Sequence, residues 1–306
     1  MWAPFASGSK RAPILAAAAA LAWLAPGVAH ACDVVVVPTS SSLHLQYDPF
    51  AFTRTAGRLL VDVESRESEP CSAELVLLDA SRKSIAETDI GGSGVRIMLS
   101  AGAGDAALVP TAAPGVWRVT LEPGRRTKLS IDAVVVREAV ATAGDHVTEL
   151  LLEMRGAQAS AARTAPIPIR LLLSAAPRAQ MNIVGANATF GQGTRITQVD
   201  FGEMVTGAVR RVFLQVRANT SARLTIVSAN RGRLLRADAP AGEVGVPYGA
   251  LLFDQPVDLT RSWETVMEPP KSIAGASIPF DLVLGPVGSR AAGTYSDVLT
   301  LEISAI

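Results

Sequence analysis

Hydrophobic and polar positions alternate along most of the chain after residue 31. Short runs rich in Val, Leu, Ile and Thr are separated by turn residues about every eight to twelve positions, a spacing typical of β-sandwiches. After residue 31, no long stretch has the periodicity of a helix. We therefore predict an all-β protein, whose clearest strands are 57–65, 72–78, 115–121, 128–136, 146–154, 210–218, 222–228, 280–285 and 297–306.

The two halves of the chain resemble each other at an offset near 149 residues. Residues 143–154 align with 292–303 without a gap, and residues 72–85 align with 221–234. Cys32 and Met181 open the two copies. We therefore predict two tandem β-sandwiches, 32–175 and 181–306, joined by a connector near 175–181.

The first copy has an extra piece that the second copy lacks. At the same offset Ile306 lies opposite Ala157, whereas the first copy continues through residues 158–179. In this piece Ile167, Ile169, Leu171 and Leu173 alternate with other residues, which predicts one more strand with an inward face. Pro168 indicates a sheet edge or the start of a strand. We predict that the first sandwich holds its own closing strand and that the second lacks its final strand.

A sandwich without its last strand exposes core side chains and an unpaired backbone edge. Burial of apolar surface is worth about 25 cal/mol per Å², so an open groove lowers stability substantially. A strand from another chain can fill such a groove, with main-chain hydrogen bonds and alternate side-chain pockets. We expect the last strand to form a wall of this acceptor groove through Leu299, Leu301, Ile303, Ala305 and Ile306.

The N-terminus predicts export. Lys10 and Arg11 precede an apolar run of twelve residues, 14–25, and Ala29-His30-Ala31 follows. These are the charged region, the apolar region and the cleavage site of a secretory signal. A membrane-spanning helix needs about 20 apolar residues, so the run is too short to be one. We assign residues 1–31 to a signal peptide and expect a protein exported through the inner membrane to the periplasm and the cell surface.

Cys32 and Cys71 are the two cysteines of the chain. An even number of cysteines in an exported chain predicts a disulfide bond. Attachment of lipid to Cys32 is the alternative, although a lipoprotein signal usually has Leu where this chain has Ala29. The sequence leaves both open and favours the disulfide.

The charges of the chain argue against nucleic acid as a partner. Residues 1–31 hold two of the 28 Lys and Arg and none of the 28 Asp and Glu, so 26 basic and 28 acidic residues remain, a formal charge of −2. Neither a basic footprint nor a polybasic patch is present. His44 and His146 lack metal-ligand partners at a suitable spacing. We expect no enzyme activity, no catalytic residue, no cofactor and no metal.

Several segments carry a family resemblance. They are residues 199–207, 228–234 and 246–253, and above all AGTYSDVLTLEI at 292–303; residues 45–57 are similar in the first copy. The second copy resembles the spore coat protein U domain of subunits of archaic chaperone–usher pili. The resemblance implies an incomplete immunoglobulin-like sandwich that receives a strand from a periplasmic pilus chaperone. An adjacent pilus subunit then replaces that strand at an outer-membrane usher.

The order of the two copies indicates a place in the pilus. A shaft subunit needs a free donor segment at its N-terminus, whereas the predicted mature chain begins at Cys32 with the first strand of a sandwich. We therefore expect a tip subunit with an adhesive role and an unknown surface receptor. Segment 101–116 is a candidate for the binding loops.

Other functions remain open from the sequence. The main alternative is a stand-alone secreted or spore/cyst-coat structural binding protein with two complete sandwiches. A secreted hydrolase would need a pocket of convergent polar groups, for which the sequence offers no cluster. A periplasmic chaperone also has two sandwiches, but the unfinished second copy disfavours it.

Overall fold

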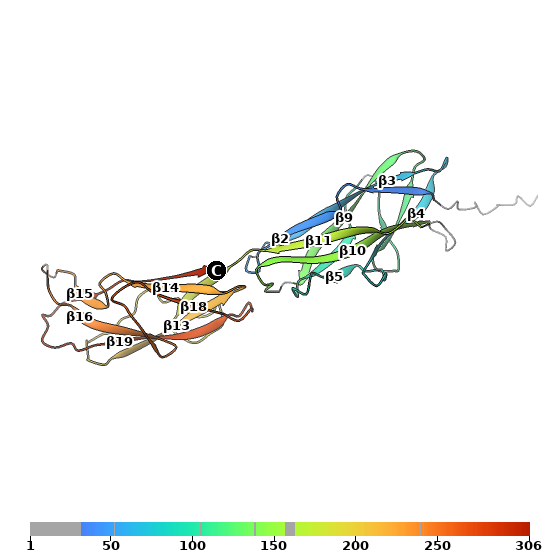
Figure 1. Ribbon diagram of the computed structural model, residues 1–306. Helices are drawn as coiled ribbons and strands as arrows, with labels where there is room; N and C mark the ends of the chain where they lie inside the picture. The colour runs from blue at the N-terminus through green and yellow to red at the C-terminus, as the bar shows by residue number, and fades with distance from the viewer. Residues whose placement is uncertain are drawn as a thin grey trace, which may run out of the picture.

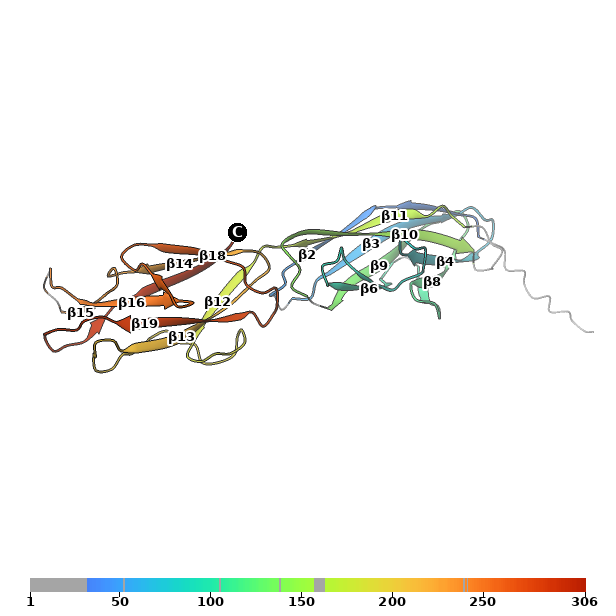
Figure 2. The same cartoon turned by 60° about the horizontal axis from the view of Figure 1, so that its bottom comes forward.

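The computed structural model describes residues 32–306 except residues 52, 105, 138, 157–162, 239 and 241. The predicted signal peptide, 1–31, lies outside these residues. The chain is all-β and forms two sandwiches that lie end to end (Figures 1 and 2). Among the described residues there is no helix of the length and apolarity needed to cross a membrane.

The first sandwich packs two sheets around one core, as the alternating pattern predicts. One sheet has the order β1-β3-β9-β6-β5 and the other the order β2-β11-β10-β4-β8-β7. The strands are β1 (Val34–Pro38), β2 (Ser42–Tyr47), β3 (Ala56–Ser65), β4 (Cys71–Leu78), β5 (Glu87–Asp89), β6 (Arg96–Ala101), β7 (Val109–Pro110), β8 (Val116–Leu121), β9 (Arg126–Arg137), β10 (Gly144–Gly156) and β11 (Ile167–Ala175).

A disulfide bond ties the start of the first sandwich to its second sheet. Cys32 and Cys71 are bonded, as predicted, and both are buried. Cys71 is the first residue of β4, so the bond joins the segment before β1 to the sheet on the other side of the core. The bond uses the sulfur atom of Cys32 that lipid attachment would need.

The extra piece of the first copy forms the closing strand β11. β11 lies between β10, to which it is antiparallel, and β2, to which it is parallel. Ile169, Leu171 and Leu173 are buried and Ile167 packs against the core, so the inward face is the predicted one. Pro168 lies near the start of β11, two residues before the pairing with β2 begins at Arg170.

The second sandwich also packs two sheets, but they differ in size. The larger has the order β12-β13-β19-β16-β15-β20 with β17 beside β16, and the smaller the order β18-β14-β21. The strands are β12 (Ala179–Val184), β13 (Val209–Ala218), β14 (Ala222–Ser228), β15 (Arg233–Arg236), β16 (Val246–Leu252), β17 (Gln255–Val257), β18 (Trp263–Met267), β19 (Ala276–Leu284), β20 (Tyr295–Ser296) and β21 (Leu299–Ala305).

The strand pairings of the first sandwich recur in the second. β14 pairs with β18 and β21 as β4 pairs with β8 and β10, and β13 pairs with β12 and β19 as β3 pairs with β1 and β9. The register repeats as well: Leu78 faces Leu151, and Val227 faces Thr300, each about 149 positions later. The difference is that β10 continues to β11 and β2, whereas no described strand follows β21.

The two sandwiches meet at a hydrogen-bonded joint. Asn219 is fully buried; its side chain accepts a hydrogen bond from the Arg178 N–H and donates one to the Ala176 carbonyl. The backbone carbonyl of Asn219 accepts a hydrogen bond from the N–H of Ala143 in the first sandwich. Arg178 also pairs with Asp48 of the first sandwich at 2.6 Å. These contacts surround the connector on both sides.

An arginine stacks between aromatic rings of both sandwiches at this joint. The guanidinium carbon of Arg217 lies 4.5 Å from the ring centre of Phe50 in the first sandwich and 4.1 Å from that of Phe190 in the second. Gln180 accepts two hydrogen bonds from the same guanidinium. Cation–π contacts of this kind are worth about 0.5–2 kcal/mol each. The joint therefore holds the two sandwiches in a defined relation.

Candidate functional site

β21 forms the outer edge of the smaller sheet in the second sandwich. In the ladder with β14, Ile306 donates to Ser221 and Ala229 donates to Val298, so the even-numbered residues of β21 face β14. Backbone groups alternate in direction along a strand, so those of Leu299, Leu301 and Ile303 point away from β14. No described strand lies on that side. The edge therefore presents free hydrogen-bond donors and acceptors.

The side chains of β21 are less buried than their counterparts in the first sandwich. Leu301 and Ile303 pair with Ile226 and Leu224, as Leu152 and Met154 pair with Leu77 and Leu75 in the same relative register. Leu152 and Met154 are fully buried; β11 pairs beside Leu152, and Thr164 of the segment before β11 pairs with Met154. Leu301 and Ile303, like Leu299, are only partly buried. Equivalent apolar positions thus differ in burial where the neighbouring strand differs.

A groove of about 670 Å³ runs beside this edge. Its walls are the apolar face of β21, Ile183 near the end of β12 and the loop that follows β12. Phe280 and Leu282 of β19 contribute to the lining from the larger sheet. Apolar residues that line the groove include Ile183, Ile196, Val199, Phe201, Met204, Val212, Leu234, Leu299 and Leu301. The groove thus has an apolar lining and one open backbone edge.

The loop after β12 is held against the larger sheet. The Ile196 N–H donates to the Ile183 carbonyl, which continues the pairing at the end of β12. The Arg210 guanidinium donates to the carbonyls of Asp200 and Phe201 at 3.0 and 2.8 Å. This wall is therefore fixed by hydrogen bonds from β13, and β21 lies across the groove from it.

A carboxylate closes the groove at the end remote from the joint. Asp297 lines this end and lies immediately before β21. It accepts hydrogen bonds from the hydroxyls of Ser228 and Tyr248, each at 2.6 Å. Burial raises the pKa of Tyr248, and the charge of Asp297 raises it further, so the phenol remains a donor. Asp297, Ser228 and Tyr248 thus form a hydrogen-bonded cluster at this end of the groove.

The predicted groove residues fall into two groups. Leu299 and Leu301 line the groove, and Ile303 packs against the same core. Ala305 faces Ala222 at the joint end. Ile306 is half exposed and is fixed by bonds with Ser221 and Thr220 outside the groove.

The strand predicted over 297–306 begins later than expected. Tyr295 and Ser296 pair with β15 of the larger sheet, and β21 starts at Leu299. Asp297 lies between these two pairings, where the chain passes from the larger sheet to the smaller one. Its side chain accepts hydrogen bonds from Ser228 and Tyr248 at this point. The sequence pattern did not reveal this role, since the alternation of apolar residues begins only after Asp297.

The start of β11, which has no neighbour from β2, differs in chemistry from the free edge of β21. Arg170 donates its N–H to Ser41 on the β2 side, so Pro168, two residues earlier, turns its nitrogen to the same side, where β2 does not reach. Proline lacks an N–H and protects a sheet edge against added strands. β21 contains no proline. The first sandwich thus blunts its edge and the second does not.

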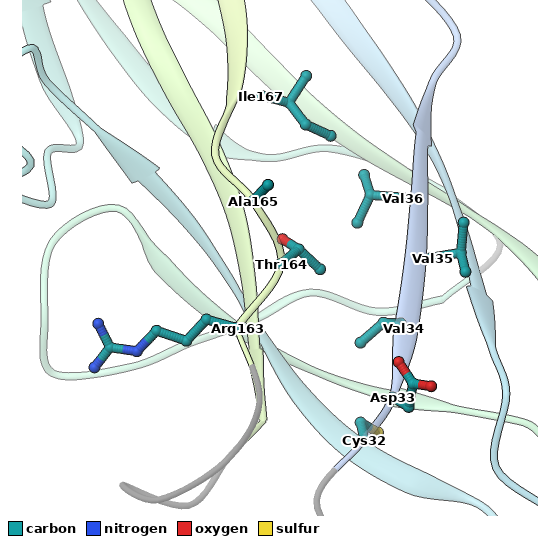
Figure 3. Close-up of a pocket in the computed structure, with 9 residues that line it drawn as sticks. All are labelled: Cys32, Asp33, Val34, Val35, Val36, Arg163, Thr164, Ala165 and Ile167. Atoms are coloured by element: carbon teal, nitrogen blue, oxygen red, sulfur yellow. The ribbon is translucent and has the colours of Figure 1, made fainter.

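A second hollow of about 390 Å³ lies at the end of the first sandwich remote from the joint (Figure 3). It separates β1 from the segment that leads into β11. Val34 and Val36 face Ala165 and Ile167 across it, whereas the Arg163 side chain points away. The hollow is apolar and has no cluster of convergent polar groups.

The remaining candidates are spread over the surface. Segment 101–116 runs from β6 in one sheet to β8 in the other, with the short β7 inside it. His44 is exposed, and His146 Nε2 donates a hydrogen bond to the Thr142 carbonyl at 2.8 Å. Within the described part of the chain, no group of three or more His, Cys, Asp or Glu side chains is placed to hold a metal ion.

No protein-family model matches the chain, and no curated protein matches its sequence. Solved structures with a similar arrangement of strands include the chaperone–tip adhesion subunit pre-assembly complex CsuC–CsuE, from archaic chaperone–usher Csu pili of Acinetobacter baumannii. That match has 8% identity, covers 88% of this chain and 99% of that chain, and has a TM-score of 0.41.

Two further structures come from enterotoxigenic Escherichia coli. A mutant form of the CFA/I adhesin CfaE matches with 10% identity over 87% of this chain and 92% of that chain, with a TM-score of 0.40. The CooA pilin subunit matches with 15% identity over 47% of this chain and 99% of that chain, with a TM-score of 0.27. The adhesin match extends over most of this chain and the pilin match over about half.

Proposed function

We propose that this protein is a subunit of a surface pilus assembled by the chaperone–usher pathway through donor-strand complementation. Its second domain, residues 181–306, is the pilin domain of the spore coat protein U family, and the groove beside β21 accepts a strand from another chain. The periplasmic chaperone lends that strand first, and an adjacent subunit replaces it at the outer-membrane usher.

One observation carries the proposal: Leu299, Leu301 and Ile303 are partly exposed, whereas Leu150, Leu152 and Met154, at the same positions of the repeated pairing, are buried. In the first sandwich β11 covers Leu150 and Leu152, and Thr164, in the segment that leads into β11, pairs with Met154. Complete burial of a Leu or Ile side chain is worth about 1.5–3 kcal/mol, so an added strand recovers several kcal/mol. The free backbone edge of β21 gives that strand its main-chain hydrogen bonds.

The first domain, residues 32–175, has the adhesive role in this proposal. It holds its own closing strand β11, so it needs no partner to complete its core. The order of the two domains, a sandwich with its own closing strand before one with an open edge, supports a place at the tip. The receptor on the target surface contacts the exposed parts of this domain.

A self-complemented chain tests the groove. A copy of residues 158–175, the piece that closes the first sandwich, is appended after Ile306 of the exported chain. Because the appended strand has the alternation that the groove requires, we expect the free energy of unfolding of the second domain to rise by at least ~3 kcal/mol. Urea denaturation, followed by the fluorescence of Trp263 in β18, measures the change.

The control appends the same segment with the copies of Ile167, Ile169, Leu171 and Leu173 replaced by Ser. It keeps the length and the backbone and lacks the apolar face, so we expect little gain. Equal stability of the parent, the control and the self-complemented chain would exclude an open groove. A self-contained coat or binding protein would then be the better account.

A further inference from the structure

The chain crosses from one sheet to the other just before β21. Ser296 pairs with Leu235 of the larger sheet, and three residues later Leu299 pairs with Ser228 of the smaller sheet. Asp297 lies at this crossing. Gly293 precedes it, at a place where a Cβ atom would come within 2.6 Å of Arg236 Cδ. The AGTYSD motif thus marks the point where the groove begins.

Asp297 binds donors on both sides of the groove. Oδ1 accepts from the N–H groups of Asn230 and Val298 at 2.9 and 2.8 Å. Oδ2 accepts from Ser228 Oγ, at the end of β14, and from Tyr248 Oη, on β16 of the larger sheet. Four donors, two of them from different sheets, therefore fix one carboxylate.

The first sandwich has a weaker connection at the equivalent position. Thr148 occupies this place in the repeated register, facing Leu171 of the closing strand. Its hydroxyl donates to the Asp89 carbonyl at 3.1 Å and accepts from the Gly91 N–H at 2.8 Å, so it also reaches the opposite sheet. In the first sandwich, where the closing strand β11 belongs to the same domain, this connection is made by a neutral hydroxyl with two hydrogen bonds. The open groove has a carboxylate with four.

We propose that Asp297 is the positioning residue that sets the register of the strand accepted by the groove. This inference rests on the proposed function and extends it. Side chains alternate with a period of two, so a slip of one residue turns the apolar face outward and is excluded. A slip of two residues keeps the apolar face inward, and the hydrophobic pattern alone does not prevent it. The fixed crossing at Asp297 defines where the pairing starts.

The register can be read by disulfide trapping in the self-complemented chain. In the first sandwich Leu151 faces Pro168, so in the equivalent register Thr300 faces the appended copy of Pro168. Thr300 is exposed on the outer face. Thr300→Cys is combined with a cysteine at the appended copy of position 168, or at the copies of 166 or 170, which are two residues away.

When Asp297 is present, we expect the cysteines at position 300 and at the copy of 168 to form at least ~10 times more disulfide than either shifted pair. Several charge-assisted hydrogen bonds to Asp297 together contribute more free energy than a tenfold preference requires. In Asp297→Ala the preference falls to within about twofold. Asp297→Asn keeps an acceptor for the N–H groups of Asn230 and Val298, so we expect this variant to retain most of the preference for the 300–168 pair. Glu268→Ala, which removes an exposed carboxylate after β18 that does not line the groove, leaves the preference unchanged.

The outcomes separate the two proposals. An unchanged preference in Asp297→Ala, with the usual gain in stability on adding the strand, overturns the role of Asp297 alone. Absence of every disulfide pair and of the gain in stability overturns the acceptor groove itself. If Asp297→Ala does not fold, Tyr248→Phe and Ser228→Ala each remove one donor, and we expect the preference to fall in both.

Discussion

At the scale of single residues, Leu152 and Leu301 show what a missing strand does. Both face a partner in the same relative register, Leu77 for one and Ile226 for the other. Leu152 is completely buried because β11 and β2 extend its sheet, whereas Leu301 lies at the last strand of a three-stranded sheet and lines a groove. The same residue type thus has two environments in one chain.

The substitution of each leucine by Ala therefore has different costs. We expect Leu152→Ala to lower the free energy of unfolding by about 2–5 kcal/mol, since it leaves a cavity in a closed core. Leu301→Ala lowers it by roughly 1 kcal/mol or less in the free chain, because the groove is already open. In the self-complemented chain the cost of Leu301→Ala rises toward that of Leu152→Ala. Urea denaturation of the three variants and their two parent chains measures these values, and an equal cost of Leu301→Ala in both forms would contradict the open groove.

An ion pair between the exposed Arg211 and the buried Asp281 makes the second domain sensitive to acid. Asp281 is 7% exposed and forms two hydrogen bonds of 2.6 Å with Arg211. The Arg211 guanidinium holds the pKa of Asp281 below its usual value, although burial opposes this. A carboxylate with a lowered pKa stabilises the fold above its unfolded pKa of about 3.9, and this contribution is lost as the pH falls through the folded pKa.

We expect Asp281→Asn to be less stable than the natural chain at pH 6 and the difference to narrow as the pH falls below about 4. Urea midpoints between pH 6 and pH 2.5 test this. Glu69→Gln, in the exposed loop between β3 and β4, serves as a control. It should change the urea midpoint by the same amount at pH 6 and at pH 2.5. A constant difference across the range would contradict the role of the pair.

At the scale of elements, alternation alone predicted ten of the 21 strands in the described part of the chain, including every strand of eight residues or more. β11 was predicted with its inward face because Ile169, Leu171 and Leu173 repeat every second residue, and burial follows that pattern. The same signal predicted the apolar face of β21. It did not reveal β20 or the crossing at Asp297, because a two-residue pairing has no period and hydrogen-bond partners far away in sequence decide it.

Amide hydrogen exchange can distinguish the two edges of β21. Leu299, Leu301 and Ile303 turn their N–H groups to the open side, whereas Thr300 and Glu302 face β14. We expect the first three amides to exchange much faster than the other two in the free chain, because they have no partner. The appended strand should protect all five. Slow exchange of the odd-numbered amides in the free chain would show that the edge is already covered.

At the scale of the whole molecule, the joint connects the first domain to the groove. β12, one wall of the groove, starts one residue after Arg178, which bonds to Asp48. Burial alone raises the pKa of Asp48. The hydrogen bonds from Arg178 and from the N–H of Phe50, with the charge of Arg178, together lower that pKa by more, so the net shift is downward. The pair is therefore charged at neutral pH. In the proposed tip subunit, a stiff joint would transmit load from one domain to the other.

The arginine between the two aromatic rings tests this stiffness. Arg217→Ala removes both cation–π contacts, each worth about 0.5–2 kcal/mol. We expect the distances between spin labels, one on each sandwich, to broaden in this variant and to remain narrow in the natural chain. Arg223→Ala, on the exposed face of β14, is the matched control and should stay narrow. An unchanged distribution in Arg217→Ala would mean that the hydrogen bonds of Asn219 suffice.

The central claim is that the second domain is completed by a strand of another chain. The most direct test is expression of the exported chain in the periplasm, alone and with an archaic pilus chaperone, followed by size-exclusion chromatography. We predict aggregation or degradation of the chain alone, one-to-one elution with the chaperone, and loss of that complex on Leu301→Asp. A stable monomer that ignores the chaperone would contradict the account.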